Sequence, residues 1–152
     1  MSIKKVASKN VVTISPKTTI LDAAKQMREL HVGDVIVVHE EGGKRTPVGI
    51  LTDRDITVSV TAFGVDPSSV YVEDVMGPTV AVAKTTDSFY QVLSLMKEHG
   101  IKRVPLVSPA GALEGIITSD DIIETLASEL GDVAKIVERQ KAVEMAHRRK
   151  FA

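Results

Sequence analysis

The sequence of 152 residues contains no cysteine and no tryptophan, and only 3% of its residues are aromatic. Without cysteine, the chain forms no disulfide, has no thiolate nucleophile and offers no cysteine ligand to a metal. With so few aromatic residues, aliphatic side chains must build the hydrophobic core. We therefore expect a core that is almost entirely aliphatic.

A strong charge of either sign is also missing, because 19 Lys and Arg residues face 20 Asp and Glu residues. General binders of nucleic acids or membrane surfaces rely on an excess of Lys and Arg, so the sequence favours neither partner. No apolar run approaches the about 20 residues of a membrane span. Residues 1–10 lack the apolar stretch of a signal peptide. We therefore expect a globular protein located in the cytoplasm.

Motifs of catalysis and metal binding are absent as well. The four histidines show no HxH or HExxH spacing, and neither GxSxG nor a Walker A pattern occurs. Two acidic clusters could suggest Mg²⁺, but acids at the start of a helix are the commoner cause of such clusters; they comprise Asp53, Asp55, Asp120 and Asp121. We expect no catalytic residue, no catalytic cofactor and no metal site, and hence no enzyme.

What the sequence does contain is an internal repeat. The octapeptide "GILTDRDI" at 49–56 returns as "GIITSDDI" at 115–122, an offset of 66 residues. Upstream, residues 6–38 align with residues 75–107 at an offset of 69. The offset changes where "HEEGGKRTPV" is three residues longer than "SPAGALE", and both stretches are rich in turn formers. Two repeats of roughly 60 residues are each too small to bury a good core alone, so we expect them to pack together.

Each repeat predicts the same order of elements. An extended piece (10–15 or 79–84) precedes a helix, and two apolar strands follow (34–39 and 48–52, or 103–108 and 114–118). A second helix is expected to begin after Thr52 or Thr118. The nearly continuous apolar runs of these strands are typical of strands buried on both faces. The order is therefore β-α-β-β-α, twice.

The first helix of each repeat shows an apolar stripe at helical spacing. The stripes comprise Ile20, Ala23, Ala24, Met27 and Leu30 in the first repeat, and Phe89, Val92, Leu93 and Met96 in the second. Thr19 and Ser88 are suitable N-caps. Gly33 and Gly100 are expected at or just past the helix ends, where a positive φ is often needed.

This organisation resembles a tandem pair of CBS domains, the arrangement called a Bateman module. The family's signature is a β-α-β-β-α repeat that ends in G-h-h-T-x-x-D-h, and both octapeptides match it. "VGDVIVV" (32–38) and "IKRVPLV" (101–107) match the second strand. The resemblance covers residues 3–127 and implies an α/β (α+β) fold of two repeats packed as a pseudo-two-fold pair. We expect repeats at 1–65 and 66–130 and a helical tail at 131–152.

The octapeptides admit two compatible interpretations. Thr52 is a good N-cap, and Asp55 stands at the third helical position, where a carboxylate suits the helix dipole. Thr118 and Asp121 repeat this arrangement. A helix start also attracts phosphate, and the resemblance implies that the two aspartates bind ribose hydroxyls while the two threonines lie near phosphate. A cap can therefore also be a binding site.

The resemblance also implies two clefts that draw on both repeats. The cleft with Asp121 is expected to use Thr118, Asp120, Ile116, Lys102 and Arg103, with Val12, Val32 and Gly33 from the first repeat. The cleft with Asp55 is expected to use Ile50, Thr52, Arg54, Ala81, Ile101 and Lys102. Arg103 occupies a position where some nucleotide-binding relatives carry a phosphate-binding arginine, whereas its counterpart Asp34 would repel phosphate. We therefore expect the Asp121 cleft to be the better phosphate site; alternatively, Lys102 and Arg103 form a solvated strand end.

Two classes of function follow from the resemblance. In the first, the protein is a regulatory module that binds AMP, ADP or ATP between the repeats and signals through conformational or dimer changes. In the second, it is a structural or dimerisation module without a nucleotide; S-adenosylmethionine and NAD(H) are further candidate ligands. By resemblance we also expect a homodimer and a protein partner whose identity the sequence does not give. The tail at 131–152 shows apolar residues at helical spacing from Asp132, with a break at Gln140. It predicts either a helix on its own module, or a dimer contact or docking element for a partner.

Overall fold

A computed structural model of the chain describes residues 3–150. These residues form two compact units, one up to Ile117 and one from Thr118 onward, and each is described by itself. The elements are α1 (Ile3–Val6), β1 (Thr13–Ile14), α2 (Ile20–Leu30), β2 (Asp34–Glu41), β3 (Lys44–Thr52), α3 (Asp53–Ser59), the 3₁₀ turn η1 (Thr61–Phe63), α4 (Val72–Val75), β4 (Ala83–Lys84), α5 (Phe89–His99), β5 (Arg103–Val107), β6 (Leu113–Thr118) and α6 (Ser119–Lys150).

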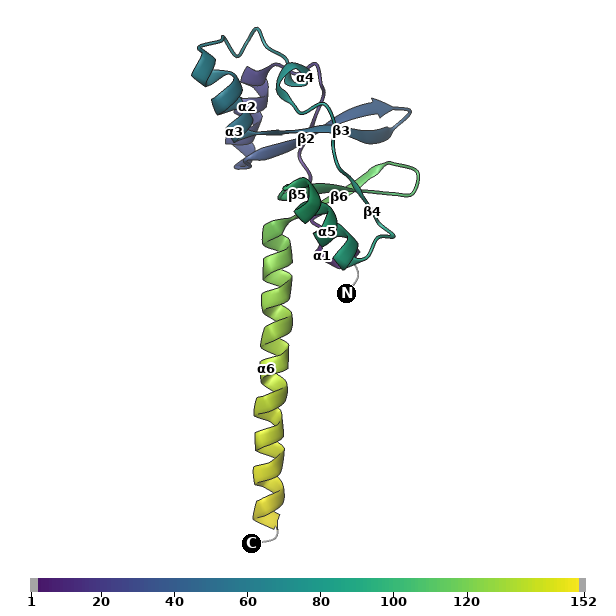
Figure 1. The fold of residues 1–152 in the computed structure, drawn as a ribbon, viewed down its shortest axis with the longest axis vertical. Coiled ribbons are helices and arrows are strands. Elements are labelled where there is room, and N and C mark those ends of the chain that lie inside the picture. The colour runs from purple at the N-terminus through teal and green to yellow at the C-terminus, as the bar shows by residue number, and fades with distance from the viewer. Residues whose placement is uncertain (1–2, 151–152) are drawn as a thin grey trace. The chain divides into compact units, whose positions relative to one another are not determined.

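Each repeat builds a sheet of three strands in the order of the chain. In the first sheet, β1 pairs with β2 in parallel and β2 pairs with β3 antiparallel. In the second sheet, β4 pairs with β5 in parallel and β6 lies beside β5. The mixed α/β fold with two related three-stranded sheets confirms the predicted β-α-β-β-α order (Figure 1).

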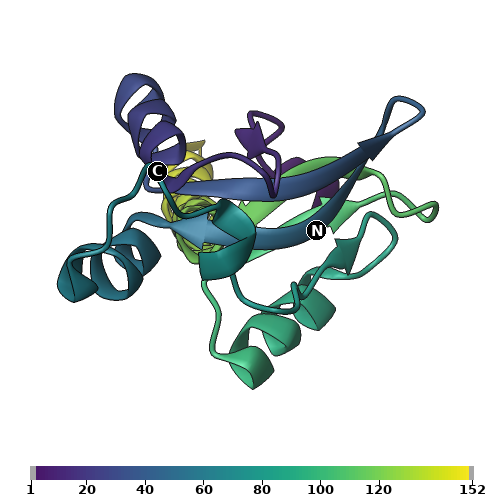
Figure 2. The same cartoon turned by 90° about the horizontal axis from the view of Figure 1, so that it is seen from above.

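Strand β2 is buried on both faces, because its side chains alternate between two cores. Val35 and Val37 belong to the core of the first repeat, under helix α2. Ile36 and Val38 belong to a second cluster that contains Leu113 and Ile116 of β6. The two hairpins therefore lie against each other, as Figure 2 shows from above. This packing explains why the strand has an almost unbroken apolar sequence.

The core is aliphatic, as the composition predicts. The fully buried side chains of the largest volume are Ile3, Ile20, Ile36, Leu51, Ile117, Val35, Val37, Val60, Val72, Val92, Val104 and Pro105. Ile3 and Val72 come from the short helices α1 and α4, and Val60 lies just before η1; the sequence pattern did not predict these elements. The extended pieces that open the repeats are shorter than expected, because only Thr13–Ile14 and Ala83–Lys84 form ladders.

Most of the predicted helix ends are confirmed. The hydroxyls of Thr19 and Ser88 accept hydrogen bonds from the backbone N–H groups of Asp22 and Gln91. Gly100 ends α5 in the left-handed region with φ 63°. In α2, however, His31 takes this conformation with φ 54°, and Gly33 does not have a positive φ.

Gly33 has a different role from the one expected. Its carbonyl accepts a hydrogen bond of 2.9 Å from the N–H of Asp53. A Cβ atom on Gly33 would lie 3.2 Å from the Asp53 carboxylate, which is closer than most side-chain contacts. The missing side chain therefore allows the start of α3 to approach the chain at Gly33.

The second unit is a single helix, α6, which includes most of the residues expected in the helical tail. A new helix was expected to begin at Asp132 and to break at Gln140, but α6 runs without interruption from Ser119 to Lys150. An ion pair of 2.7 Å joins Lys135 to Asp132, and the Gln140 side chain donates to Glu144 at 3.2 Å. These contacts over three and four residues stabilise the helical turns that follow Asp132 and Gln140. Residues 151 and 152 of the expected tail lie outside the described residues.

Candidate functional site

Both octapeptides form the same hydrogen-bonded helix start. At α3, the Thr52 hydroxyl accepts from the Asp55 N–H at 3.1 Å, while Oδ2 of Asp55 accepts from the Thr52 N–H at 2.9 Å and from the Thr52 hydroxyl at 2.8 Å. At α6, Thr118 and Asp121 make the same three bonds at 3.1, 2.8 and 2.7 Å. In both helices Oδ2 of the aspartate is used by the cap, and Oδ1 has no partner among the described residues.

The first amides of α3 are also used within the protein. The N–H groups of Asp53, Arg54 and Asp55 donate to the Gly33 carbonyl, the Asp53 carboxylate and the Thr52 hydroxyl. These amides are therefore not free to bind phosphate in this conformation, although the sequence suggested such a site. A phosphate group near this helix would need another partner, for which a cationic side chain is the natural candidate.

A cavity of about 180 Å³, here called cavity A, lies between the two repeats within the first unit. It is lined by Asn10, Val11, Val12, Val32, Gly33, Asp34, Ile36 and Ile116. Four of these residues, Val12, Val32, Gly33 and Ile116, are those expected in the wall of the Asp121 cleft. The lining is largely apolar, with the carboxylate of Asp34 as its charged group.

A second cavity of about 150 Å³, here called cavity B, is its counterpart. Its lining comprises Ile50, Gly77, Thr79, Val80, Ala81, Ile101 and Arg103. Ile50, Ala81 and Ile101 are the apolar residues expected in the Asp55 cleft. Arg103 was expected in the other cleft, and the structure differs here, because this residue lines cavity B.

The two cavities are built from equivalent positions of the repeats. Residues 10–12 of cavity A correspond to residues 79–81 of cavity B at the offset of 69, and Val32 corresponds to Ile101. Asp34 and Arg103 also correspond to each other, so that one cavity has a carboxylate where the other has a guanidinium. The two sites thus share a shape but differ in charge.

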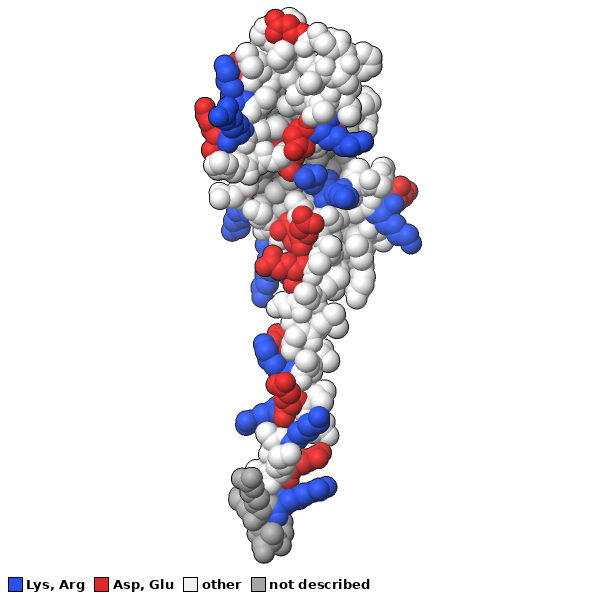
Figure 3. Space-filling model, turned by 90° about the vertical axis from the view of Figure 1, so that its left-hand side faces the viewer, with Lys and Arg blue, Asp and Glu red and all other residues white. Residues whose placement is uncertain are grey.

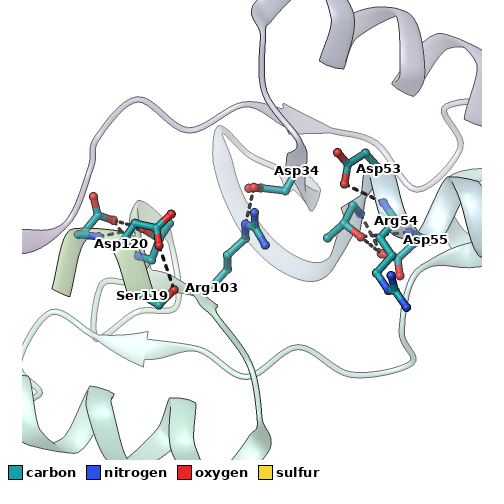
Figure 4. A network of polar contacts seen from close by, with 10 residues as sticks. Asp34, Asp53, Arg54, Asp55, Arg103, Ser119 and Asp120 are labelled. Atoms are coloured by element: carbon teal, nitrogen blue, oxygen red, sulfur yellow. Dashed lines mark hydrogen bonds and ion pairs between the residues drawn. The ribbon is translucent and has the colours of Figure 1, made fainter. Parts of the chain in front are cut away.

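Asp34 and Arg103 form an ion pair that connects the two linings (Figure 4). Nε of Arg103 is buried and contacts Oδ2 of Asp34, although the direction is not that of a hydrogen bond. The two side chains are 21% and 37% exposed, so that water reaches both.

The remaining predicted site residues do not line either cavity. Lys102 and Arg54 are exposed, and neither is part of a lining. Asp120 follows the cap of α6 and accepts a long contact of 3.4 Å from the Ser119 hydroxyl. Thr118, Asp120 and Asp121 belong to the second unit.

Several lining residues were not among the predicted ones. Asn10 and Val11 belong to cavity A, and Gly77, Thr79 and Val80 belong to cavity B. The repeat itself contained the signal for most of them, because residues 10–12 align with residues 79–81 and Val12 was already expected in the wall. Among the described residues, no cluster of three or more His, Cys, Asp or Glu side chains could hold a metal ion.

The comparison with known protein families matches each of the two repeats separately. The family model of the CBS domain matches residues 3–61 and again residues 72–128. The chain belongs to the CBS domain family. The CBS domain-containing protein YhcV of Bacillus subtilis is 36% identical over 121 residues, which cover 80% of this chain and 82% of that protein. An uncharacterized protein of Methanopyrus kandleri is also 36% identical, over 82% of this chain, and the match spans 62% of its length.

Solved CBS structures have the same fold. Hypoxic response protein I with two coordinated zinc ions aligns with a TM-score of 0.70 and 27% identity, over 82% of this chain and 98% of that chain. A hexameric CBS-CP12 protein from bloom-forming cyanobacteria aligns with a TM-score of 0.70 and 32% identity, over 81% and 69% of the two chains.

CBS-domain pairs are regulatory modules, and this general role is the one that the family assigns to the chain. Relatives that consist of CBS domains alone are regulatory or of unknown function. The match to inosine-5'-monophosphate dehydrogenase of Methanocaldococcus jannaschii covers 22% of that enzyme, which is its CBS part. In the described part of the chain, no helix is both long and apolar enough to cross a membrane.

Proposed function

We propose that the protein is a cytoplasmic regulatory module that binds an adenosine-containing ligand, of the class of AMP, ADP or ATP, between its two CBS repeats. Binding would shift the protein between two conformations or dimer arrangements that a partner protein reads. Such a shift requires that the ligand bind one state more tightly than the other. The hexameric cyanobacterial relative supports the view that CBS pairs of this kind assemble with copies of themselves.

The observation that supports this proposal most strongly is the pair of equivalent cavities at the junction of the repeats. Cavities of about 180 and 150 Å³ lie below the range of pockets that enclose a whole drug-sized ligand. They therefore suit a flat base rather than an entire nucleotide, and the ribose and phosphate would lie outside them. Apolar walls such as Ile50 and Ile101 match the faces of a purine.

Cavity B is the better site for a ligand with phosphate groups. Arg103 lines this cavity, and its two terminal amino groups donate no hydrogen bond to another described residue. A guanidinium binds phosphate through paired hydrogen bonds, which are stronger than those between neutral groups. Asp34 gives cavity A a negative charge instead, so cavity B is the proposed phosphate site rather than the Asp121 cleft.

The carboxylates of the two caps remain candidates for the ribose. Oδ1 of Asp55 is available for a hydroxyl, while Oδ2 is already engaged with Thr52. One hydrogen bond to a ribose hydroxyl is therefore compatible with the cap as it stands, whereas a second would compete with two existing bonds. The same reasoning applies to Asp121 within its own helix start.

The competing function is a structural or dimerisation module whose cavities bind no nucleotide; S-adenosylmethionine and NAD(H) are the other candidate ligands. A melting-temperature screen with AMP, ADP, ATP, adenosine, S-adenosylmethionine and NAD(H) separates these functions. A ligand that binds the folded state at about 100 times its Kd adds about 2.7 kcal/mol of stability. We expect AMP, ADP or ATP to raise the melting temperature. No shift with any compound would support the structural module.

A further inference from the structure

Helix α6 exposes an apolar stripe over most of its length. Its large side chains include Leu130, which is 70% exposed, and Val133, which is 58% exposed. The stripe consists of Ile123, Leu126, Leu130, Val133 and Val137. Because the second unit is one helix, it contains no other element that could cover this stripe. Helices in proteins owe most of their stability to the packing of such a face.

The spacing of the stripe is that of a coiled coil. Its members alternate in steps of three and four residues, so that Ile123, Leu130 and Val137 occupy one heptad position and Leu126 and Val133 the other. The next position of the series is Gln140, and a single polar residue at such a position is known to fix register. A stripe at this spacing is typical of pairing with another helix, and the exposed Ile136 and Val143 lie beside it.

The charges of α6 indicate how a second helix would lie. Residues 119–134 contain five carboxylates and no Lys or Arg. From Lys135 to Arg148, four cationic side chains outnumber two carboxylates; they are Lys135, Arg139, Lys141 and Arg148 against Glu138 and Glu144. Figure 3 shows uncharged surface running down the helix between these charged groups. Two copies side by side in the same direction would place like charges together, whereas an antiparallel pair places the acidic half against the basic half.

We propose that α6 pairs with α6 of a second copy of this chain as an antiparallel coiled coil. The register that keeps the stripe in contact places Leu130 against Val133 of the second copy and Leu126 against Val137. Ile123 then lies opposite Gln140. On the flanks, Asp120 meets Lys141 of the second copy, and Ala127 meets Ala134, where small side chains allow close approach. The opposed helix dipoles also favour this direction. The interface is additional to the proposed ligand sites and independent of whether they bind a nucleotide.

Single cysteines test this arrangement cleanly, because the natural chain has none. In the antiparallel register, full-length Leu130→Cys alone and Val133→Cys alone form no disulfide dimer, while an equal mixture of the two does. A parallel pair would link each variant to itself. Disulfide dimers in the separate samples, or none in the mixture, would overturn the proposal. A Ser128→Cys and Arg139→Cys mixture, at positions away from the stripe, is the matched control and is expected to stay unlinked.

The mass in solution provides a second measurement without ligand. Light scattering of the double variant Leu130→Asp and Val137→Asp is expected to give half the mass of the natural protein. Circular dichroism of the same sample, together with a melting transition for the CBS repeats, reports whether the rest of the chain is folded. A folded double variant of unchanged mass would show that the stripe packs on its own chain or on another partner, and would overturn the proposal. Neither measurement uses a nucleotide. A result that contradicts the coiled coil is therefore distinct from a result that contradicts the proposed nucleotide binding.

Discussion

Asp34 and Arg103 occupy equivalent positions in the two repeats and form an ion pair with each other. Each residue lines a different cavity, so the pair connects two sites that the pseudo-symmetry would otherwise make alike. Because both side chains are partly exposed, the pair contributes about 0–1 kcal/mol to stability. An anionic ligand in cavity B can therefore recruit Arg103 away from Asp34 at small cost.

The first prediction concerns the phosphate of the ligand. Arg103→Gln is expected to weaken AMP binding at least about tenfold, because hydrogen bonds to charged groups contribute about 1.5–3 kcal/mol. Adenosine, which has no phosphate, is expected to bind the variant as well as it binds the natural protein. Isothermal titration calorimetry with both compounds measures the difference. An equal loss for AMP and adenosine would show that Arg103 does not contact the phosphate.

The second prediction concerns Asp34, the other member of the ion pair, whose substitution is expected to raise AMP affinity. Asp34→Asn releases Arg103 from competition while it keeps the size of the side chain. AMP affinity is expected to rise by up to about fivefold, which corresponds to the strength of a partly exposed ion pair. Arg103→Gln in the same background should cancel this gain. An AMP affinity that falls in Asp34→Asn would contradict the competition.

The third prediction concerns the cap of α3. Asp55→Ala removes an acceptor of two hydrogen bonds from Thr52 and is expected to lower the free energy of unfolding by about 1–2 kcal/mol. Glu29→Ala is the matched control, because this carboxylate is exposed on α2 and makes no contact that the cap requires. Urea denaturation measures both variants. Equal free energies of unfolding for Asp55→Ala and Glu29→Ala would show that the cap does not stabilise the fold.

The fourth prediction uses the glycine that opens each octapeptide. A Cβ atom on Gly115 would lie 2.8 Å from the backbone oxygen of Ser8, which cannot move easily because it accepts from the Ile116 N–H. We expect Gly115→Ala to destabilise the protein by about 1–3 kcal/mol. Gly49→Ala meets the flexible Met76 side chain instead and should cost less.

Gly131→Ala is the control for this pair, because nothing lies within 4 Å of its added Cβ atom and the residue is inside α6. It is expected to stabilise the helix by about 0.5–1 kcal/mol. Thermal melts of the three variants give the order of their stabilities. A Gly115→Ala protein as stable as the natural one would contradict the close approach of Ser8.

The fifth prediction concerns acid. The N–H and hydroxyl of Ser68 donate hydrogen bonds to Asp66, and they lower the pKa of this carboxyl below its usual value of 3.8. A lowered pKa stabilises the folded state above the unfolded pKa, and this stabilisation is lost as the pH falls through the folded value. The stability difference between the natural protein and Asp66→Asn should therefore shrink as the pH falls through and below 3.8. Denaturation curves across this range measure it, and a constant difference would contradict the shift.

Much of the fold was predictable because the repeat is encoded locally. The octapeptides contain the complete cap, since a Thr and an Asp three residues apart satisfy each other wherever a helix starts, as Thr52 and Asp55 do. The apolar run of β2 predicted burial on both faces, which the structure confirms. Such features depend on neighbours in the chain and require no knowledge of distant contacts.

The charged contacts could not be predicted in the same way. Arg103 is 69 residues from Asp34, and the sequence shows only that the two are equivalent and opposite in charge. Which cavity Arg103 lines depends on the direction of its side chain in the packed pair of repeats. The length of α6 also escaped prediction, because side-chain pairs stabilise the helical turns that follow Asp132 and Gln140, where the sequence predicted a helix start and a break.

A crystal structure of the protein with AMP tests the central claim most directly. We predict electron density for the base in cavity B, between Ile50 and Ile101, with the phosphate within hydrogen-bond distance of an Arg103 side chain that has left Asp34. A structure at saturating AMP in which cavity B is empty and the ion pair of Asp34 and Arg103 is intact would contradict the account.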